Sequence, residues 1–205
     1  VRYKREAGET QVLKNHHLDR LRKGGIGGAC FVIWADTYNG HAPKDEMEAI
    51  VKGIKGEMAE TKEFVLIHNV EELKAAEAAG KFAILLGIEG LAGIGEDLSK
   101  IDELYDLGAR HAMLTWNEEN ALATGVKGDP NRGVTELGKQ AIKKLQEKKM
   151  ILDVSHINEK SFWDVIDLAT GPILASHSNA KALASAARNL TDDQLRAIRD
   201  TNGLV

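Results

Sequence analysis

Short apolar runs alternate with amphipathic segments along most of the chain. Five runs are short, apolar and often β-branched, as strands buried on both faces of a parallel sheet are: 29–34, 83–88, 112–115, 151–155 and 173–176. Between them, apolar residues recur at helical spacing, most clearly over 45–60 and 97–108. This alternation favours βα units and a parallel sheet.

Polar residues mark where several of these helices begin. Asn69 is followed three residues later by Glu72, and Thr191 by Gln194, the pattern of a capping box. Two more helices are expected after Thr135 and Asn158. With no linker-like segment, we expect one α/β domain over 1–205, with the alternating units of a (β/α)8 TIM barrel. Five confident βα units are too few to close an eight-stranded barrel, so we expect a chain that lacks the first and last strands and is incomplete at both ends.

Three of the predicted strands end in a residue that can bind a metal ion. Glu89 ends AILLGIE, His156 ends ILDVSH and His177 follows ILAS. Each alone is more typical of a structural polar residue, but three in chain order indicate a metal hydrolase, because barrel enzymes carry their reacting groups where strands end. Gly90 permits close backbone approach beside Glu89, and Asp153 is a candidate to orient a ligand from behind.

Composition and charge narrow the class of protein. The chain has 205 residues, 43% of them hydrophobic, and 27 basic against 31 acidic residues that are scattered along it. This is typical of a soluble globular protein without a nucleic-acid footprint. No run approaches the roughly 20 apolar residues of a membrane helix. The single cysteine, Cys30, lies in an apolar run, so we expect a buried thiol, a reducing compartment and a cytoplasmic location.

Three blocks of sequence resemble a known family. LLGIEG, LDVSH and SHSNAKALASAARN, in this order, are similar to the renal or membrane dipeptidases (peptidase family M19), which are zinc-dependent dipeptidases with a (β/α)8 barrel. The resemblance implies two zinc ions bridged by Glu89, with His156 and His177 completing the second zinc site. It implies a small dipeptide as substrate, contacted by Arg188 and attacked by a hydroxide held between the zinc ions. A planar guanidinium suits a dipeptide carboxylate.

The chain also departs from the family pattern. The histidine-x-aspartate pair of the first zinc site would lie before Val1, and the candidate acid/base aspartate would lie beyond Val205. Trp116 stands where some relatives carry a substrate-contacting histidine, so Trp116 or Asn117 is expected to shape the substrate pocket instead. The remaining histidines, at positions 16, 17, 41, 68 and 111, are not expected to bind metal.

Two other functions stay open. The chain could be a related TIM-barrel amidohydrolase or phosphoesterase that acts on another small substrate, because the same kind of metal site serves these reactions. A non-catalytic relative is the other reading, because half of the metal ligands have no counterpart in the chain. The sequence leaves the preferred dipeptide, its stereochemistry and the oligomeric state open, with a homodimer as one possibility.

Overall fold

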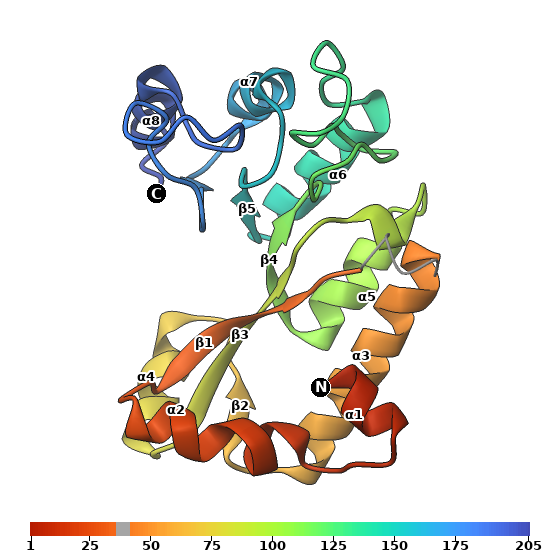
Figure 1. Ribbon diagram of the computed structural model, residues 1–205, viewed down its shortest axis with the longest axis vertical. Helices are drawn as coiled ribbons and strands as arrows, with labels where there is room; N and C mark the ends of the chain where they lie inside the picture. The colour runs from red at the N-terminus through yellow and green to blue at the C-terminus, as the bar shows by residue number, and fades with distance from the viewer. Residues whose placement is uncertain (36–41) are drawn as a thin grey trace. The chain divides into compact units, whose positions relative to one another are not determined.

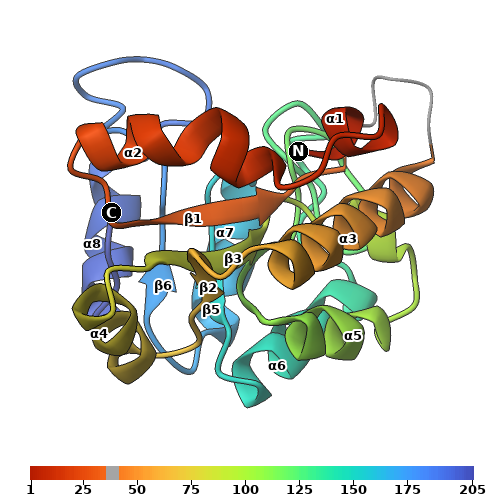
Figure 2. The ribbon, with the colours of Figure 1, turned by 90° about the horizontal axis from the view of Figure 1, so that it is seen from below.

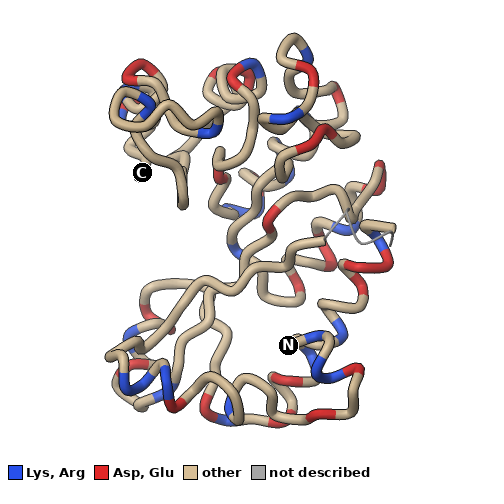
Figure 3. Tube along the Cα trace, viewed as in Figure 1, with Lys and Arg blue, Asp and Glu red and all other residues tan. Residues whose placement is uncertain are grey.

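The computed structural model describes residues 1–35 and 42–205, which group into two compact units, Val1–Gly87 and Ile88–Val205 (Figure 1). In each unit, strands alternate with helices, and acidic and basic residues are interspersed along the trace (Figure 3). Across the described ranges, no helix combines the length and the apolar character that crossing a bilayer requires. The single-domain organisation stays a prediction.

The first unit is a small parallel sheet with flanking helices. β2 runs parallel to β3, with Phe64 opposite Phe82, and β1 also pairs with β3. The helix α2 lies beside β1 (Figure 2). The described elements are α1 (Arg2–Glu6), the π-helical turn η1 (Lys14–Leu18), α2 (Asp19–Lys23), β1 (Gly28–Ile33), α3 (Pro43–Glu60), β2 (Phe64–Leu66), α4 (Val70–Ala78) and β3 (Phe82–Ile88), whose last residue lies in the second unit.

The core of this unit joins the N-terminal segment to the sheet. Leu13 and Leu18 pack with Phe64, Phe82 and Ile84, each at most 6% exposed. The rings of Phe64 and Phe82 lie 5.4 Å apart in a tilted arrangement, a favourable geometry for aromatic pairs. The sequence pattern did not predict β2, because its three residues are too few to show an alternation.

The second unit contains three parallel strands that lie side by side. His111 of β4 is opposite Ile151 of β5, and Leu152 of β5 is opposite Ile173 of β6. The described elements are η2 (Ala92–Ile94), α5 (Lys100–Leu107), β4 (Ala109–Met113), α6 (Glu136–Glu147), β5 (Ile151–Asp153), α7 (Glu159–Leu168), β6 (Ile173–Leu174) and α8 (Asp192–Asp200). Parallel strands of this kind present their carboxyl ends at one edge of the sheet.

The predicted helix starts are confirmed. The Asn69 side chain accepts a hydrogen bond from the Glu72 amide, and Thr191 and Gln194 form a reciprocal capping box. Thr135 and Asn158 each accept an amide hydrogen bond three residues on, at Gly138 and Ser161. These caps satisfy amide groups that an isolated helix end leaves without partners.

Several predicted strands end earlier than expected, and in two of them the same side chain is the cause. The runs 151–155 and 173–176 give strands that end at Asp153 and Leu174. The amides of Ser155 and Ser176 donate to the carboxylate of Asp153, and not to a neighbouring strand. A side chain therefore ends both strands at the same level.

The prediction of a buried Cys30 is wrong for this chain. The thiol is exposed, although it has polar or electrostatic neighbours. Side chains alternate between the two faces of a strand. In β1, Ala29 and Phe31 pack against the core, whereas Cys30 and Val32 lie on the exposed face.

Candidate metal centre

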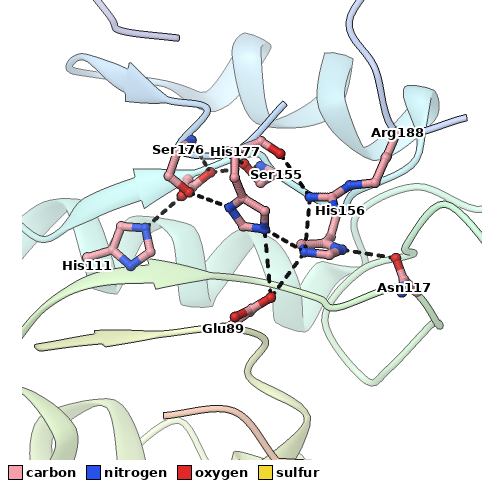
Figure 4. Close-up of polar contacts among 9 residues, drawn as sticks. Glu89, His111, Asn117, Ser155, His156, Ser176, His177 and Arg188 are labelled. Carbon is pink, nitrogen blue, oxygen red and sulfur yellow. Dashed lines mark hydrogen bonds and ion pairs between the residues drawn. The ribbon is translucent and has the colours of Figure 1, made fainter. Parts of the chain in front are cut away.

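The three predicted metal ligands converge in the second unit. Glu89 follows β3 directly, while His156 and His177 lie three residues beyond Asp153 and Leu174, which are opposite each other in β5 and β6. Equal offsets from paired residues bring the two imidazoles to the same level. One donor atom from each of the three residues lies within 4.8 Å of the others (Figure 4).

The donor atoms of this cluster face one another. The two Nε2 atoms of His156 and His177 are 2.7 Å apart, and the Oε1 atom of Glu89 lies 3.1 Å from the first and 3.7 Å from the second. Two imidazole lone pairs at this distance repel unless a positive charge lies between them. Two nitrogens and a carboxylate oxygen are a ligand set that suits a divalent metal ion.

Each imidazole is held from behind by a polar side chain. Nδ1 of His156 lies 2.9 Å from Oδ1 of Asn117, and Nδ1 of His177 lies 2.7 Å from Oγ of Ser176 (Figure 4). When His156 carries its proton on Nδ1, it donates to Asn117 and leaves the Nε2 lone pair facing the cluster. Such contacts orient metal-binding histidines in general.

The backbone around the ligands adopts unusual conformations. His156 has a φ of 75°, which is uncommon for a residue other than glycine and is a sign of local strain at functional sites. Gly90 has a φ of 86°, and a Cβ atom there would lie 2.9 Å from the backbone nitrogen of Trp116. The glycine after Glu89 is therefore required both by its dihedral angle and by the close approach of the next strand end.

The charges around the cluster favour the metal-binding forms of the ligands. The hydrogen bond to His156 lowers the pKa of Glu89 below its ordinary value, against the opposing effect of burial. Burial lowers the pKa of His177, and the neighbouring His156 and Arg188 lower it further. Near neutral pH, Glu89 is thus an anion and His177 favours the neutral imidazole that coordinates metals.

Arg188 lies beside the cluster, in the loop between β6 and α8. Its Nη2 atom donates to the backbone oxygen of His177 at 3.0 Å and lies 3.2 Å from Nε2 of His156. The buried Asn189 next to it accepts from the amide of Asn179 and donates to the backbone oxygen of Ala184, so it holds the turn. The guanidinium is thereby fixed at the edge of the metal ligands.

Trp116 and Asn117 follow β4 and border the same cluster. The Trp116 ring is 6.0 Å from that of His156, at 44°. Asn117 contacts His156 directly, a contact that the sequence did not predict. Their role in binding substrate stays a prediction.

Sequence reasoning singled out Asp153 but missed its buried partner in the same unit, His111. The predicted strand 112–115 begins after His111, but this histidine lies in the middle of β4, and its Nε2 atom is 2.7 Å from Oδ2 of Asp153. Asp153 contacts neither ligand imidazole in the described hydrogen bonds, but binds the amides that precede them. The Ser-His dipeptide occurs at 155–156 and again at 176–177, and this repeat was the sequence signal for the two equivalent amides that Asp153 binds.

The other histidines lie elsewhere. His16 contacts Glu9 and His68 contacts Glu72, both at partly exposed positions in the first unit. His17 lies in the same π-helical turn as His16. His41 lies outside the described residues.

The chain matches known proteins over most of its length. The family model described as membrane dipeptidase (peptidase family M19) matches residues 4–205. An uncharacterized protein of Acinetobacter calcoaceticus is 38% identical over 151 residues, covering 71% of this chain and 48% of that protein. An uncharacterized dipeptidase of Schizosaccharomyces pombe is 28% identical over 214 residues, covering 96% of this chain and 51% of that protein.

A solved structure matches the fold closely. It is a metallo peptidase from Rhodobacter sphaeroides liganded with a phosphinate mimic of the dipeptide L-Ala-D-Ala, with a TM-score of 0.85 and 26% identity. The match covers 95% of this chain and 67% of that one, and it confirms the parallel α/β, TIM-barrel-like fold. The chain spans about half the length of the curated relatives named above.

Proposed function

The chain belongs to the membrane dipeptidase family, and from that premise we propose that it acts as a zinc-dependent dipeptidase. The observation that carries this proposal is the convergence of Glu89, His156 and His177, whose donor atoms lie within 4.8 Å of one another. Imidazole nitrogens and a carboxylate oxygen are common ligands of catalytic zinc. A cytoplasmic location and a homodimer stay predictions.

Glu89 is suited to serve two ions. Its Oε1 atom faces both histidines, at 3.1 Å and 3.7 Å, which leaves Oε2 as the donor for a second cation. Its lowered pKa keeps it ionised near neutrality, so it acts as a ligand and not as a proton donor. Zinc, when bound, would supply activation of a water molecule and polarisation of the peptide carbonyl.

The position of Arg188 is an argument for a small substrate with a free carboxylate. Its guanidinium lies 3.2 Å from a metal-binding nitrogen of His156, so a carboxylate that it holds is placed beside the reacting bond. A dipeptide has its C-terminal carboxylate one residue from the scissile bond, which fits this short distance. The phosphinate dipeptide mimic bound by the Rhodobacter relative is a ligand of the same class.

Metal content of the 205-residue chain tests the centre. We expect zinc to be retained after reconstitution by the unaltered chain and lost by Glu89→Gln, because an amide cannot supply the anionic ligand. Glu96→Gln is the matched control, since Glu96 is exposed and lies in the loop that follows the same strand. Equal zinc content in Glu89→Gln and the unaltered chain would contradict the assignment.

A substrate panel tests the reaction. We expect hydrolysis of dipeptides with a free C-terminal carboxylate, little hydrolysis of the same dipeptides carrying a C-terminal amide, and a raised KM in Arg188→Ala. Arg188→Lys retains the charge without the planar fork and should recover part of the loss. Preferential hydrolysis of cyclic amides or phosphoesters would instead favour the related hydrolases.

A further inference from the structure

A buried carboxylate lies behind the metal centre and connects three strands. We propose that Asp153, paired with His111, is a positioning residue that fixes the backbone from which His156 and His177 project. This inference rests on the proposed function, because its consequence is the affinity of the same centre for metal.

The hydrogen bonds of Asp153 reach both strand ends. Its Oδ1 atom accepts from the amide of Ser155 at 2.8 Å and from the amide of Ser176 at 3.3 Å. Each of these serines directly precedes a ligand histidine. One oxygen atom thus sets the relative height of the two segments that carry the ligands.

The two serines extend the connection to His177. Oγ of Ser176 lies 2.7 Å from Nδ1 of His177, and Oγ of Ser155 accepts from the amide of the same histidine at 3.2 Å. Ser155 is fully buried, which shields its bond to the His177 amide from water, whereas the Ser176–His177 contact lies at an exposed position. Asp153 is therefore connected to His177 through both serines, which Figure 4 draws beside the imidazole.

His111 holds the other oxygen of Asp153 from the neighbouring strand. The two side chains are 3% and 0% exposed, and Nε2 of His111 is 2.7 Å from Oδ2 of Asp153. Burial raises the pKa of Asp153, but the hydrogen bonds from His111, Ser176 and Ser155 outweigh it, and the pKa lies below its ordinary value. A buried carboxylate that stays ionised is a strong acceptor, which makes the arrangement rigid.

Stability alone does not explain why Asp153 and His111 are buried. An apolar pair of similar volume is often at least as stable as a buried charged pair. The Nδ1 atom of His111 also has no hydrogen-bond partner among the described residues. The pair is therefore better explained by the geometry that it imposes at the strand ends than by a gain in stability.

Two substitutions in the same strand test the proposal on the full chain. Asp153→Ala removes the acceptor of both amides, and we expect zinc affinity, measured by competition with a chromophoric chelator, to fall about 10- to 100-fold, as for other residues that orient ligands. Leu152→Ala is the matched control, because Leu152 is 2% exposed, adjacent in β5 and outside the hydrogen-bonded path. It should lower the melting temperature and leave zinc affinity unchanged.

Conservative variants separate position from stability and remain informative if Asp153→Ala does not fold. Asp153→Asn keeps an acceptor oxygen for the two amides, and should lose less affinity than Asp153→Ala. His111→Gln keeps a donor to Asp153, whereas His111→Met removes it, so only the latter should weaken zinc binding. Substituted Co²⁺ should give an altered visible spectrum in His111→Met and an unaltered one in Leu152→Ala.

Three outcomes are distinguishable. Zinc binding by the unaltered chain with unchanged affinity in Asp153→Ala or His111→Met would overturn the positioning role and leave the proposed function intact. Equal losses in Leu152→Ala and Asp153→Ala would also overturn it, since general destabilisation would explain both. Failure of the unaltered chain to bind zinc would overturn the proposed function, and with it this inference.

Discussion

Glu57 in the first unit and Glu89 in the second are both carboxylates shielded from solvent, with side chains 1% and 20% exposed. Their partners differ. Glu57 accepts from the guanidinium of Arg5 at 2.6 Å and from the amides of Val12 and Leu13 at 3.0 Å and 2.9 Å. Its charge is thus stabilised by two amides and by a guanidinium that it shares with Glu60.

Glu89 faces two imidazoles, one of which favours its neutral form. Arg188 acts on Glu89 only through space, and a carboxylate whose direct partners are imidazoles keeps its capacity to bind a cation. The comparison shows that burial of a carboxylate does not identify a functional site. The chemistry of the partners does, because an arginine neutralises the charge permanently and histidines do not.

The largest expected effect concerns stability. Glu57→Ala leaves Arg5 and two amides without their acceptor, so we expect the free energy of unfolding to fall by about 3–5 kcal/mol. Urea denaturation monitored by circular dichroism measures this. Glu48→Ala, at an exposed position of the same helix, should stay within about 0.5 kcal/mol of the unaltered chain. An equally small change in Glu57→Ala would remove the basis of the comparison.

Glu89 should matter more than Glu57 for the stability that the chain gains when it binds zinc. Zinc at about 100 times its dissociation constant should raise the free energy of unfolding by about 2.7 kcal/mol, because it binds only the folded state. Glu57→Ala should retain this increment, and Glu89→Gln should lose it. Denaturation with and without a chelator measures both, and an increment in Glu89→Gln equal to that of the unaltered chain would contradict the assigned ligand.

A smaller effect is expected at Asn117. Its side chain fixes the proton of His156 on Nδ1, so Asn117→Ala should lower zinc affinity about tenfold, the lower end of what orienting contacts contribute. Asn117→Asp keeps the acceptor and should retain more affinity. Asn131→Ala is a control in the same loop, where the side chain contacts Asp129. A chelator competition titration distinguishes these variants.

The smallest effect is a pH dependence of the metal-free chain. The pKa of His177 is lowered from its ordinary value of 6.5, so the unfolded chain binds more protons than the folded chain just below that pH. This contribution to stability is complete above pH 6.5 and is lost as the pH falls through the folded pKa. The free energy of unfolding, measured above and below this pH range, should therefore be lower on the acid side. The difference should be smaller in His177→Gln. An identical decline in the variant would assign it to other groups.

Local patterns were sufficient for much of the fold. The caps at Asn69 and Thr191 were predictable because their hydrogen bonds join residues three apart. The strand runs were predictable because burial on both faces selects apolar residues. The clustering of Glu89, His156 and His177 was predictable because strands of a parallel sheet end at a common edge.

The orientation of the ligands was not predictable in this way. Asn117 and His156 are separated by 39 residues, and His111 and Asp153 by 42. In the first unit, Glu57 meets Val12 across 45 residues.

The sequence by itself therefore determined the kind of elements, their order and the residues able to bind a metal ion. Only the tertiary structure decided that Asn117 holds His156, that Asp153 sets the strand ends and that Glu57 meets Arg5 and two distant amides. Those contacts depend on the register of strands and the path of loops, and no periodicity or short motif records which distant side chains that register brings together.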